Sequence, residues 1–400
     1  MCIRDRTGLG ADAAAEEIAL FVPRQDSFWE RTVYFAQDAA ADLKMNLKVY
    51  VADGNNEQMV AQVRSAVKGK VDGIIFPAYQ NTGETILKIA EDNKIPAIMI
   101  NARLLYADHW PRMKYKYWIG SVLPEDQKVG AVLIQKLIQD ARLRIAQRVH
   151  ILAIEGNPQD ESSIARIRGF NDYLRHETDL ASVKVITGNW DRETAAAQFI
   201  AYYRQHPEID IVWCANDQMA FGAMEAIRIL GINKKIIVGG IDWDEQISEK
   251  IRQDLMQVSI GGHFLDGAWA MVLMTDYLHG FDFGDEAVKY ESPMVSIDRK
   301  NLSRFLPILS LSPQSIDFSR YAKTYNPTVK FHRLHLQTIA EELAAATGIV
   351  ELNEEEKSWL AAHKDIRIGI DPAWPPFDFV DETDTHAGLT SCLLYTSPSP

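Results

Sequence analysis

Apolar segments of two kinds alternate along most of this 400-residue chain, and this alternation limits the possible folds more than any other feature. Short runs rich in β-branched residues, such as 18–22 and 73–76, are typical of strands buried on both faces. Longer segments between them, such as 29–43, carry apolar residues at helical spacing. Strands that alternate with helices of these lengths form βαβ units, so the sequence predicts an α/β fold with parallel sheets.

The alternation runs through the chain twice, with a long aromatic and basic excursion at 102–116 between the two halves. The fragments KVDGIIFPA (70–78) and EIDIVWCAN (208–216) look like the same element in each half, which is a faint internal repeat. We therefore expect two similar lobes, each a parallel sheet flanked by helices, with a hinge between them for which Gly261-Gly262 is a candidate. The expected boundaries are about 17–118 and 261–287 for lobe 1, and about 119–260 and 288–309 for lobe 2.

Four segments lie outside the expected lobes. The ends MCIRDR (1–6) and SCLLYTSPSP (391–400) resemble translated sequencing adapter, so 1–16 is expected to be an artefactual or unstructured start and 391–400 an artefactual tail. Residues 310–365 are expected to form a linker with helices. Residues 366–390 contain a strand, a proline-rich turn and a second strand, but about 24 residues cannot bury a core. We expect this last segment to be the start of a further domain that is cut off.

Charge and motif content exclude several function classes. A formal net charge of −13 and a pI of about 5.3 argue against nucleic acid or an anionic membrane as the main partner. The sequence contains no nucleophile elbow, Walker motif, G-x-G-x-x-G or H-E-x-x-H, so we expect neither catalysis nor a cofactor. His332-x-x-His335 has loose metal-like spacing, but no cysteine or carboxylate stands close in sequence. We expect a solvated helix face there and no metal site.

The stretch IDIVWCANDQMAFGAMEA (209–226) contains a polar pair at the end of a buried strand. Asn216 and Asp217 follow the apolar run, and a small apolar stripe at helical spacing comes next. In open α/β sheets, ligands bind at such carboxyl ends of strands. The alternative is that the two residues only cap the helix, with Asp217 as the cap; for this turn taken alone, the capping role is favoured.

Further motifs follow in order along residues 17–309. The first strand is followed by the aromatics Phe28 and Trp29, and the fourth by Asn101-Ala102. Arg166 precedes Gly-Phe, and Trp190 lies in NWDRE. The Asn216-Asp217 pair comes next, and Asp242 follows GGI. In this order they resemble the type I periplasmic sugar-binding proteins, and among them the ribose-binding and autoinducer-2-binding receptors. The resemblance implies a two-lobe periplasmic protein that closes on a sugar and catalyses nothing.

Two positions depart from the pattern of these relatives. Ala102 stands in place of an arginine, and Gly261 stands where the relatives offer a glutamine or an arginine. The lost donors argue against ribose and autoinducer-2 as the ligand. His263 and Arg103 are nearby residues that would replace those donors.

The residue types suit a sugar-like ligand, although each has a structural alternative. Hydroxyl rims need fixed donors and acceptors such as Asn101, Arg166, Asn216 and Asp242, and apolar sugar faces need flat rings such as Trp190. We expect Phe28, Trp29 and Asn101 on one lobe, and Arg166, Trp190, Asn216 and Asp242 on the other. The alternatives are a core role for Trp29 and His263, a turn role for Asn101, a surface charge at Arg103, and a surface ion pair of Arg166 with Asp160 or Glu161.

A second resemblance bears on where the bound state is reported. Residues 366–389 resemble the opening of family-3 extracellular solute-binding domains, and the lead-in LNEEEKSWLAAHKDIRIG is similar to the linker before such domains in membrane-bound sensor kinases. Signalling through domains in cis is therefore our first expectation, with a parent protein anchored in the inner membrane. Delivery to an ABC sugar permease is the alternative, and an α/β sugar-modifying enzyme ranks below both. A LacI-like repressor core would need a DNA-binding headpiece before residue 17.

Overall fold

The computed structural model describes residues 15–104, 109–145, 147–292, 294–310 and 316–333, together with scattered positions between 336 and 387. The chain divides into two compact units, Met1–Val350 and Glu351–Pro400. The adapter-like ends, 1–6 and 391–400, lie outside the described residues.

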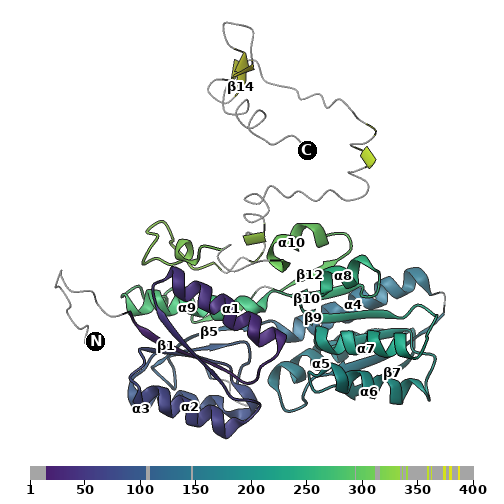
Figure 1. Ribbon diagram of the computed structural model, residues 1–400, viewed down its shortest axis with the longest axis horizontal. Helices are drawn as coiled ribbons and strands as arrows, with labels where there is room; N and C mark the ends of the chain where they lie inside the picture. The colour runs from purple at the N-terminus through teal and green to yellow at the C-terminus, as the bar shows by residue number, and fades with distance from the viewer. Residues whose placement is uncertain are drawn as a thin grey trace, which may run out of the picture. The chain divides into compact units, whose positions relative to one another are not determined.

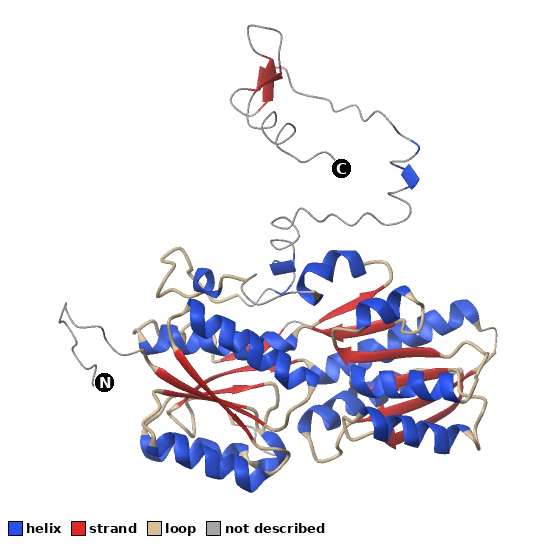
Figure 2. Ribbon diagram, viewed as in Figure 1, coloured by secondary structure: helices blue, strands red, loops and turns tan. Residues whose placement is uncertain are grey.

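The first unit contains two separate six-stranded sheets with helices on both faces (Figure 2). The first sheet has the order β11-β5-β4-β3-β1-β2, and its strand pairs are all parallel. We call the part built on this sheet lobe 1. Its strands are β1 (Glu17–Val22), β2 (Asn46–Val51), β3 (Gly73–Phe76), β4 (Ala97–Ile100), β5 (Trp118–Pro124) and β11 (Lys289–Ser292).

Strand β1 shows why the first sheet needs cover on both faces. Ile18, Leu20 and Val22 belong to the apolar cluster of helices α1 (Ser27–Asp42) and α9 (Asp266–Leu278). Ala19 and Phe21 belong to the cluster of α2 (Asn56–Lys68) and α3 (Gly83–Asn93). Since successive side chains of a strand point to opposite faces, the two helix pairs cover opposite faces of the sheet (Figure 1).

The second sheet, on which lobe 2 is built, has the order β12-β10-β9-β8-β6-β7, with β12 antiparallel to β10 and the other pairs parallel. Its strands are β6 (Val149–Glu155), β7 (Leu180–Thr187), β8 (Ile211–Cys214), β9 (Ile237–Asp242), β10 (Val258–Gly261) and β12 (Val295–Asp298). Its helices are α4 (Asp126–Arg144), α5 (Glu161–Leu174), α6 (Arg192–Tyr203), α7 (Asp217–Ile229), α8 (Ile247–Arg252) and α10 (Leu302–Leu309). The predicted two-lobe α/β architecture is confirmed.

The lobe boundaries differ from those expected from the sequence. Strands β5 and β11 were expected in lobe 2, but both pair in the sheet of lobe 1. After the segment 102–116, β5 pairs in parallel with β4 and so extends the same sheet. The chain passes between the lobes at 124–126, 261–266 and 292–295.

Residues 316–333 pack against lobe 1, although they were expected to be part of a linker. The amide N of Phe318 donates to Asp42 over 2.8 Å, and the amide N of Thr324 donates to Asp276 over 2.8 Å. Nε2 of His332 lies 2.7 Å from Asp276, and its Nδ1 lies 3.1 Å from Glu286. The expectation of a solvated helix face is therefore wrong for His332, because carboxylates distant in sequence enclose its ring. His335 lies outside the described residues.

The second unit contains a small antiparallel sheet of β13 (Ala373–Trp374), β14 (Asp378–Val380) and β15 (His386–Ala387). Strands β13 and β14 flank the expected proline-rich turn, while the expected strand before it, near 366–370, lies outside the described residues. Among the residues that the structure describes, no helix has the length and apolar character needed to cross a membrane.

Candidate ligand-binding site

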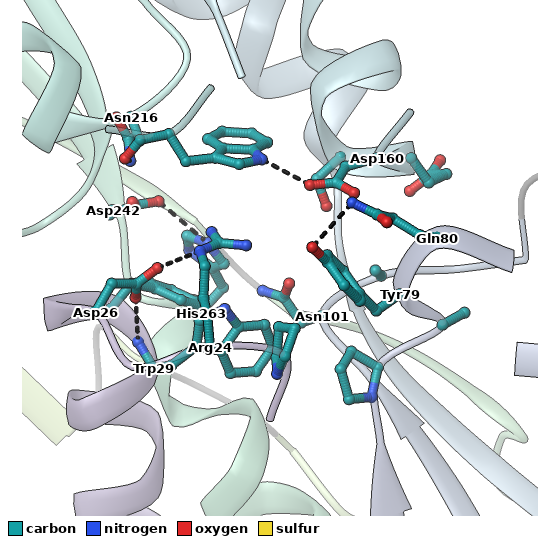
Figure 3. A pocket seen from close by; sticks show the side chains of 18 of the residues that line it. Arg24, Asp26, Trp29, Tyr79, Gln80, Asn101, Asp160, Asn216, Asp242 and His263 are labelled. Carbon is teal, nitrogen blue, oxygen red and sulfur yellow. Dashed lines mark hydrogen bonds and ion pairs between the residues drawn. The ribbon is translucent and has the colours of Figure 1, made fainter. Parts of the chain in front are cut away.

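A cavity opens between the two lobes at the carboxyl ends of their strands (Figure 3). Lobe 1 contributes the segments after β1, β3 and β4. Lobe 2 contributes the start of α5, the segments after β7 and β8, and the end of β9, and His263 follows β10. The lining residues include the following: Arg24, Asp26, Phe28, Trp29, Tyr79, Gln80, Asn101, Ala102, Asp160, Glu161, Ser162, Arg166, Trp190, Asn216, Asp242 and His263. Sheet edges of this kind are where open α/β folds bind ligands.

The structure brings the sequence-predicted candidates to this cavity, with the exceptions of Asp217 and Arg103. The carboxylate of Asp217 is fully buried on another side, where it accepts hydrogen bonds from Ser259 Oγ (2.8 Å) and from the amide N of Asp244 (2.9 Å). Burial raises the pKa of Asp217 well above its ordinary value. Asp217 is therefore not a lining residue of the cavity, contrary to expectation.

The capping role expected for this turn belongs to Asn216. Its Oδ1 accepts the amide N of Met219 over 2.9 Å, and its Nδ2 donates to the carbonyl oxygen of Trp190 over 3.3 Å. Asp217 is thus the first residue of α7, which explains why its side chain turns back toward the sheet. Asn216 lines the cavity while its amide oxygen is engaged by the helix.

Arg166 is buried at the base of the cavity and holds several groups together. Its Nε donates to Asp126 over 2.6 Å, and its Nη1 donates to the carbonyl oxygen of Ala215 over 2.7 Å. Nη1 also lies 3.4 Å from Asp242, and Nη2 lies 3.2 Å from Nε2 of His263. A surface ion pair of Arg166 is excluded, because its side chain is only 4% exposed.

The contact with Arg166 fixes the tautomer of His263. A guanidinium can only donate, so Nε2 of His263 accepts and Nδ1 carries the hydrogen. Burial, and then the charge of Arg166, lower the pKa of His263 well below its ordinary value, so the ring is neutral. One face of the ring lies against Phe28, with 4.6 Å between centroids. Its Nδ1 has no partner among the described residues, which leaves a buried donor without an acceptor.

Asp242 ends β9 in a strained backbone conformation. Its φ is 123°, in a region that favours glycine, and the φ of the next residue, Trp243, is 63°. A Cβ on Gly261 would lie 2.5 Å from the carbonyl carbon of Asp242 and 2.7 Å from the Trp243 ring. Glycine at 261 is therefore required by close approach of the two strands. Burial raises the pKa of Asp242 to about 7, although Arg166 acts in the opposite direction.

Of the two residues expected to replace the missing donors, His263 and Arg103, only one lines the cavity. His263 lies in the cavity, whereas Arg103 does not line it. Nη2 of Arg103 donates to the carbonyl oxygen of Pro124 over 3.1 Å, and Nε lies 3.4 Å from Glu161. With a side chain 50% exposed, Arg103 is a surface residue beside the crossing between the lobes.

The aromatic candidates provide ring surfaces from both lobes. The indole of Trp190 rests on Gly156, where a Cβ would come within 2.2 Å of the ring. Its Nε1 donates to Oδ2 of Asp160 over 2.7 Å, as drawn in Figure 3. In lobe 1, Phe28 meets Trp29 edge to face at 5.3 Å. Trp29 is 4% exposed and belongs to the core cluster, so its core role and its place in the cavity wall coexist.

Sequence reasoning missed several lining residues: Arg24, Asp26, Tyr79, Gln80, Asp160, Glu161 and Ser162. Asp26 caps α1, since its Oδ1 accepts the amide N of Trp29 over 2.9 Å, and its Oδ2 lies 2.6 Å from Nε of Arg24. Gln80 has a φ of 38° and donates to the hydroxyl of Tyr79 over 2.9 Å. Position in the sequence could have indicated these residues, because each of them closely follows a predicted strand or lies at the start of a helix.

Comparison with known proteins agrees with the fold. The chain is 29% identical over 184 residues to the D-ribose/D-allose-binding protein of Pseudomonas aeruginosa, which covers 45% of this chain and about half, 54%, of that relative. A periplasmic sugar-binding protein from Pseudomonas fluorescens has a TM-score of 0.70 at 24% identity, over 81% of this chain and 99% of that one. The fructose-binding periplasmic domain of a hybrid two-component system has a TM-score of 0.61 at 19% identity, over 72% and 92%.

These relatives are binding proteins rather than enzymes. The model of the periplasmic binding protein domain family matches residues 18–280, which contain most of both lobes and every lining residue of the cavity. The match extends over more than half of the chain, which therefore belongs to the periplasmic binding protein domain family.

Proposed function

We propose that the cavity between the lobes binds a small polyhydroxy ligand, a sugar or a polyol, and that binding favours closure of the lobes about their crossings. The observation that carries this proposal is a cavity lined from both lobes by aromatic rings and by hydrogen-bonding groups. Several of these groups have no partner among the described residues: Asp160 Oδ1, Glu161 Oε2, Ser162 Oγ and His263 Nδ1. Buried polar groups need partners, and the hydroxyls of a polyol both donate and accept.

The ring surfaces suit the apolar faces of such a ligand. Trp190 belongs to lobe 2, and Phe28 and Trp29 belong to lobe 1, so a sugar between them contacts rings of both lobes. A ligand that contacts both lobes binds the closed arrangement more tightly than the open one, and this difference in affinity drives closure.

The bound state is reported, in our proposal, to domains in cis. Two observations support sensing: the strands β13 to β15 follow the binding domain in the same chain, and a sensor domain of a two-component system has a similar fold. The resemblance of residues 366–389 to the start of a family-3 solute-binding domain points the same way. The proposed location is the periplasm, with the parent protein anchored in the inner membrane.

Delivery to an ABC permease is the second candidate. The family match and the ribose/allose-binding relative favour it, because both describe solute-binding proteins. The gene that encodes the chain discriminates between the two candidates. A kinase or cyclase region in the same reading frame supports sensing, whereas a permease gene beside it supports transport.

Calorimetric titration and thermal shift of the full chain with pentoses, hexoses and polyols test the binding proposal. A ligand at 100 times its dissociation constant adds about 2.7 kcal/mol to the free energy of unfolding. Trp190→Ala and Asp242→Ala are expected to abolish the shift while the apo protein stays folded. The matched controls are Trp110→Ala, since Trp110 is 49% exposed, and Asp179→Ala, since the side chain of Asp179 is 73% exposed. A shift that survives both cavity variants, or a panel without binding, contradicts the proposal.

A further inference from the structure

Carboxylates outnumber cationic groups in the wall of the cavity. Asp26, Asp160, Glu161 and Asp242 line it, against two guanidinium groups, those of Arg24 and Arg166. The neutral His263 adds no charge. The pairing of these groups decides which carboxylates remain without a counter-charge.

Arg24 and Asp26 form a matched pair. Nε of Arg24 lies 2.6 Å from Oδ2 of Asp26, and Oδ1 of Asp26 accepts the amide N of Trp29. Both carboxylate oxygens are therefore engaged, and the pair contributes no net charge to the cavity.

Arg166 serves two carboxylates. It lies 2.6 Å from Asp126, behind the cavity wall, and 3.4 Å from Asp242, in the wall. One positive charge therefore faces two negative ones, and the shorter contact is with Asp126. Burial raises the pKa of Asp242 to about 7, as expected for a carboxyl with an incomplete counter-charge.

At the start of α5, two further carboxylates of the cavity wall, Asp160 and Glu161, also lack a complete positive counter-charge. Asp160 is 8% exposed; its Oδ2 accepts the Trp190 indole N–H, but its Oδ1 accepts no hydrogen bond from the described residues. Against the larger effect of burial, the charge of Arg24 and the side chain of Gln80 lower the pKa of Asp160. The neighbouring Glu161 lies 3.4 Å from the half-exposed Arg103 through Oε1, while its Oε2 has no described partner. Burial raises the pKa of both carboxyls, that of Glu161 to about 7.

From this arrangement we infer that the ligand carries a protonated amine, as in an amino sugar or an amine-bearing polyol, and that Asp160 and Glu161 receive the ammonium group. The inference rests on the proposed function, that the cavity binds a polyhydroxy molecule. A hydroxyl supplies one hydrogen bond to a buried carboxylate and leaves its charge uncompensated, whereas an ammonium group supplies three donors and the missing charge. A phosphorylated or carboxylated sugar increases the negative excess and is disfavoured.

The test compares matched probes on the full chain by calorimetry at pH 7. The pairs are D-glucosamine with D-glucose, D-galactosamine with D-galactose and D-mannosamine with D-mannose, and the N-acetyl derivatives are neutral controls for size. In the best-bound pair, the amine is expected to bind about tenfold tighter or more than both neutral forms, as a charged hydrogen bond provides. Equal or tighter binding of a neutral form overturns the inference and leaves the proposed function standing. Absence of binding by every probe and by the neutral panel overturns both.

Charge-removing variants locate the effect. The variant Asp160→Asn keeps an oxygen that can accept the Trp190 indole N–H but removes the negative charge. The variant Glu161→Gln removes the negative charge at the neighbouring position. Each is expected to weaken amine binding about tenfold while the neutral partner of the pair changes less than about threefold. Asp179→Asn, at an exposed site, is the control. An equal loss for amine and neutral sugar in both variants indicates a purely structural role and overturns the assignment of the ammonium to these carboxylates.

Discussion

The guanidinium of Arg31, on α1 of lobe 1, donates to the carbonyl oxygen of Trp243, in lobe 2, over 2.6 Å. Its second terminal nitrogen donates to the carbonyl oxygen of Ile308, also in lobe 2, over 2.7 Å. The carbon of the guanidinium lies 3.9 Å from the ring centroid of Phe264. Burial lowers the pKa of Arg31 to about 10, so the group stays charged at neutral pH. Arg31 thus links the lobes outside the ligand cavity.

Removing this link is expected to weaken ligand binding without any change in the cavity wall. Each net hydrogen bond contributes ~1 kcal/mol, so Arg31→Met, which retains apolar packing on Phe264, is expected to lower affinity about 5- to 30-fold. Calorimetry with the best-bound sugar measures the loss, and small-angle scattering measures the shift toward open lobes. Arg64→Met, on the surface of α2, is the control. Unchanged affinity contradicts a role for Arg31 in closure.

Gly261 is expected to tolerate no larger residue. A side chain at this position overlaps the backbone of Asp242 and the ring of Trp243, so Gly261→Gln is expected to lower the free energy of unfolding by about 1–3 kcal/mol. Because the new side chain displaces the backbone of Asp242 in the cavity wall, ligand binding is expected to weaken as well. Chemical denaturation followed by circular dichroism measures the first effect, and calorimetry the second. Leu255→Gln, at an exposed position before β10, is the control; equal stability of the two variants contradicts the packing argument.

The architecture could be predicted because its cause is local in sequence. Ile18, Leu20 and Val22 face one helix layer and Ala19 and Phe21 the other, which requires the unbroken apolar run that the sequence contains. The sheet to which β5 belongs could not be predicted, because a long segment, 102–116, separates β5 from β4 in the sequence. Periodicity does not reveal on which sheet a strand lies after such an excursion.

The candidate site could be predicted where residues lie within two positions of the end of a strand, as Asn101 and Asn216 do. It could not be predicted where a choice between neighbours is geometric. Asn216 takes the cap, so Asp217 turns toward Ser259, and either order of roles fits the sequence. Asp160 was predicted only as a surface partner, because the contact that buries it comes from Trp190, thirty residues later.

His332 is expected to hold residues 316–333 on lobe 1. Its ring lies between the carboxylates of Asp276 and Glu286, at 2.7 and 3.1 Å, and its side chain is 1% exposed. The variant His332→Ala removes one hydrogen-bond partner from each carboxylate, although Asp276 keeps the amide N–H groups of Lys323 and Thr324, so it is expected to lower the free energy of unfolding by about 2 kcal/mol. Urea denaturation measures this change. Phe331→Ala, at a side chain 62% exposed, is expected to stay within about 0.5 kcal/mol. A similar small effect at His332 contradicts the anchoring role.

The buried carboxyls predict how stability depends on pH. Burial raises the pKa of Asp242 and of Glu161 to about 7 in the folded protein, well above their ordinary values. Between pH ~4 and ~7 the folded state therefore binds more protons than the unfolded state, and the free energy of unfolding falls as pH rises. The pKa values of Asp276 and Glu286 are lowered, so their stabilisation is lost only when pH falls below this window.

In the apo protein, these two carboxyls are accordingly expected to favour stability at pH 5.5 over pH 7.5 by about 2 kcal/mol each. The raised pKa of Asp217 acts in the same direction, and the lowered pKa of His263 acts in the opposite direction. Denaturation of the full chain at both pH values, without ligand, measures the difference. Asp242→Asn is expected to remove about 2 kcal/mol of this difference, and the double variant with Glu161→Gln about twice as much, because the amides have no proton to exchange. Asp179→Asn, at an exposed site, is expected to leave it unchanged. If the double variant keeps the full difference, these carboxyls are ionised in the folded protein at neutral pH and the burial argument for their pKa fails.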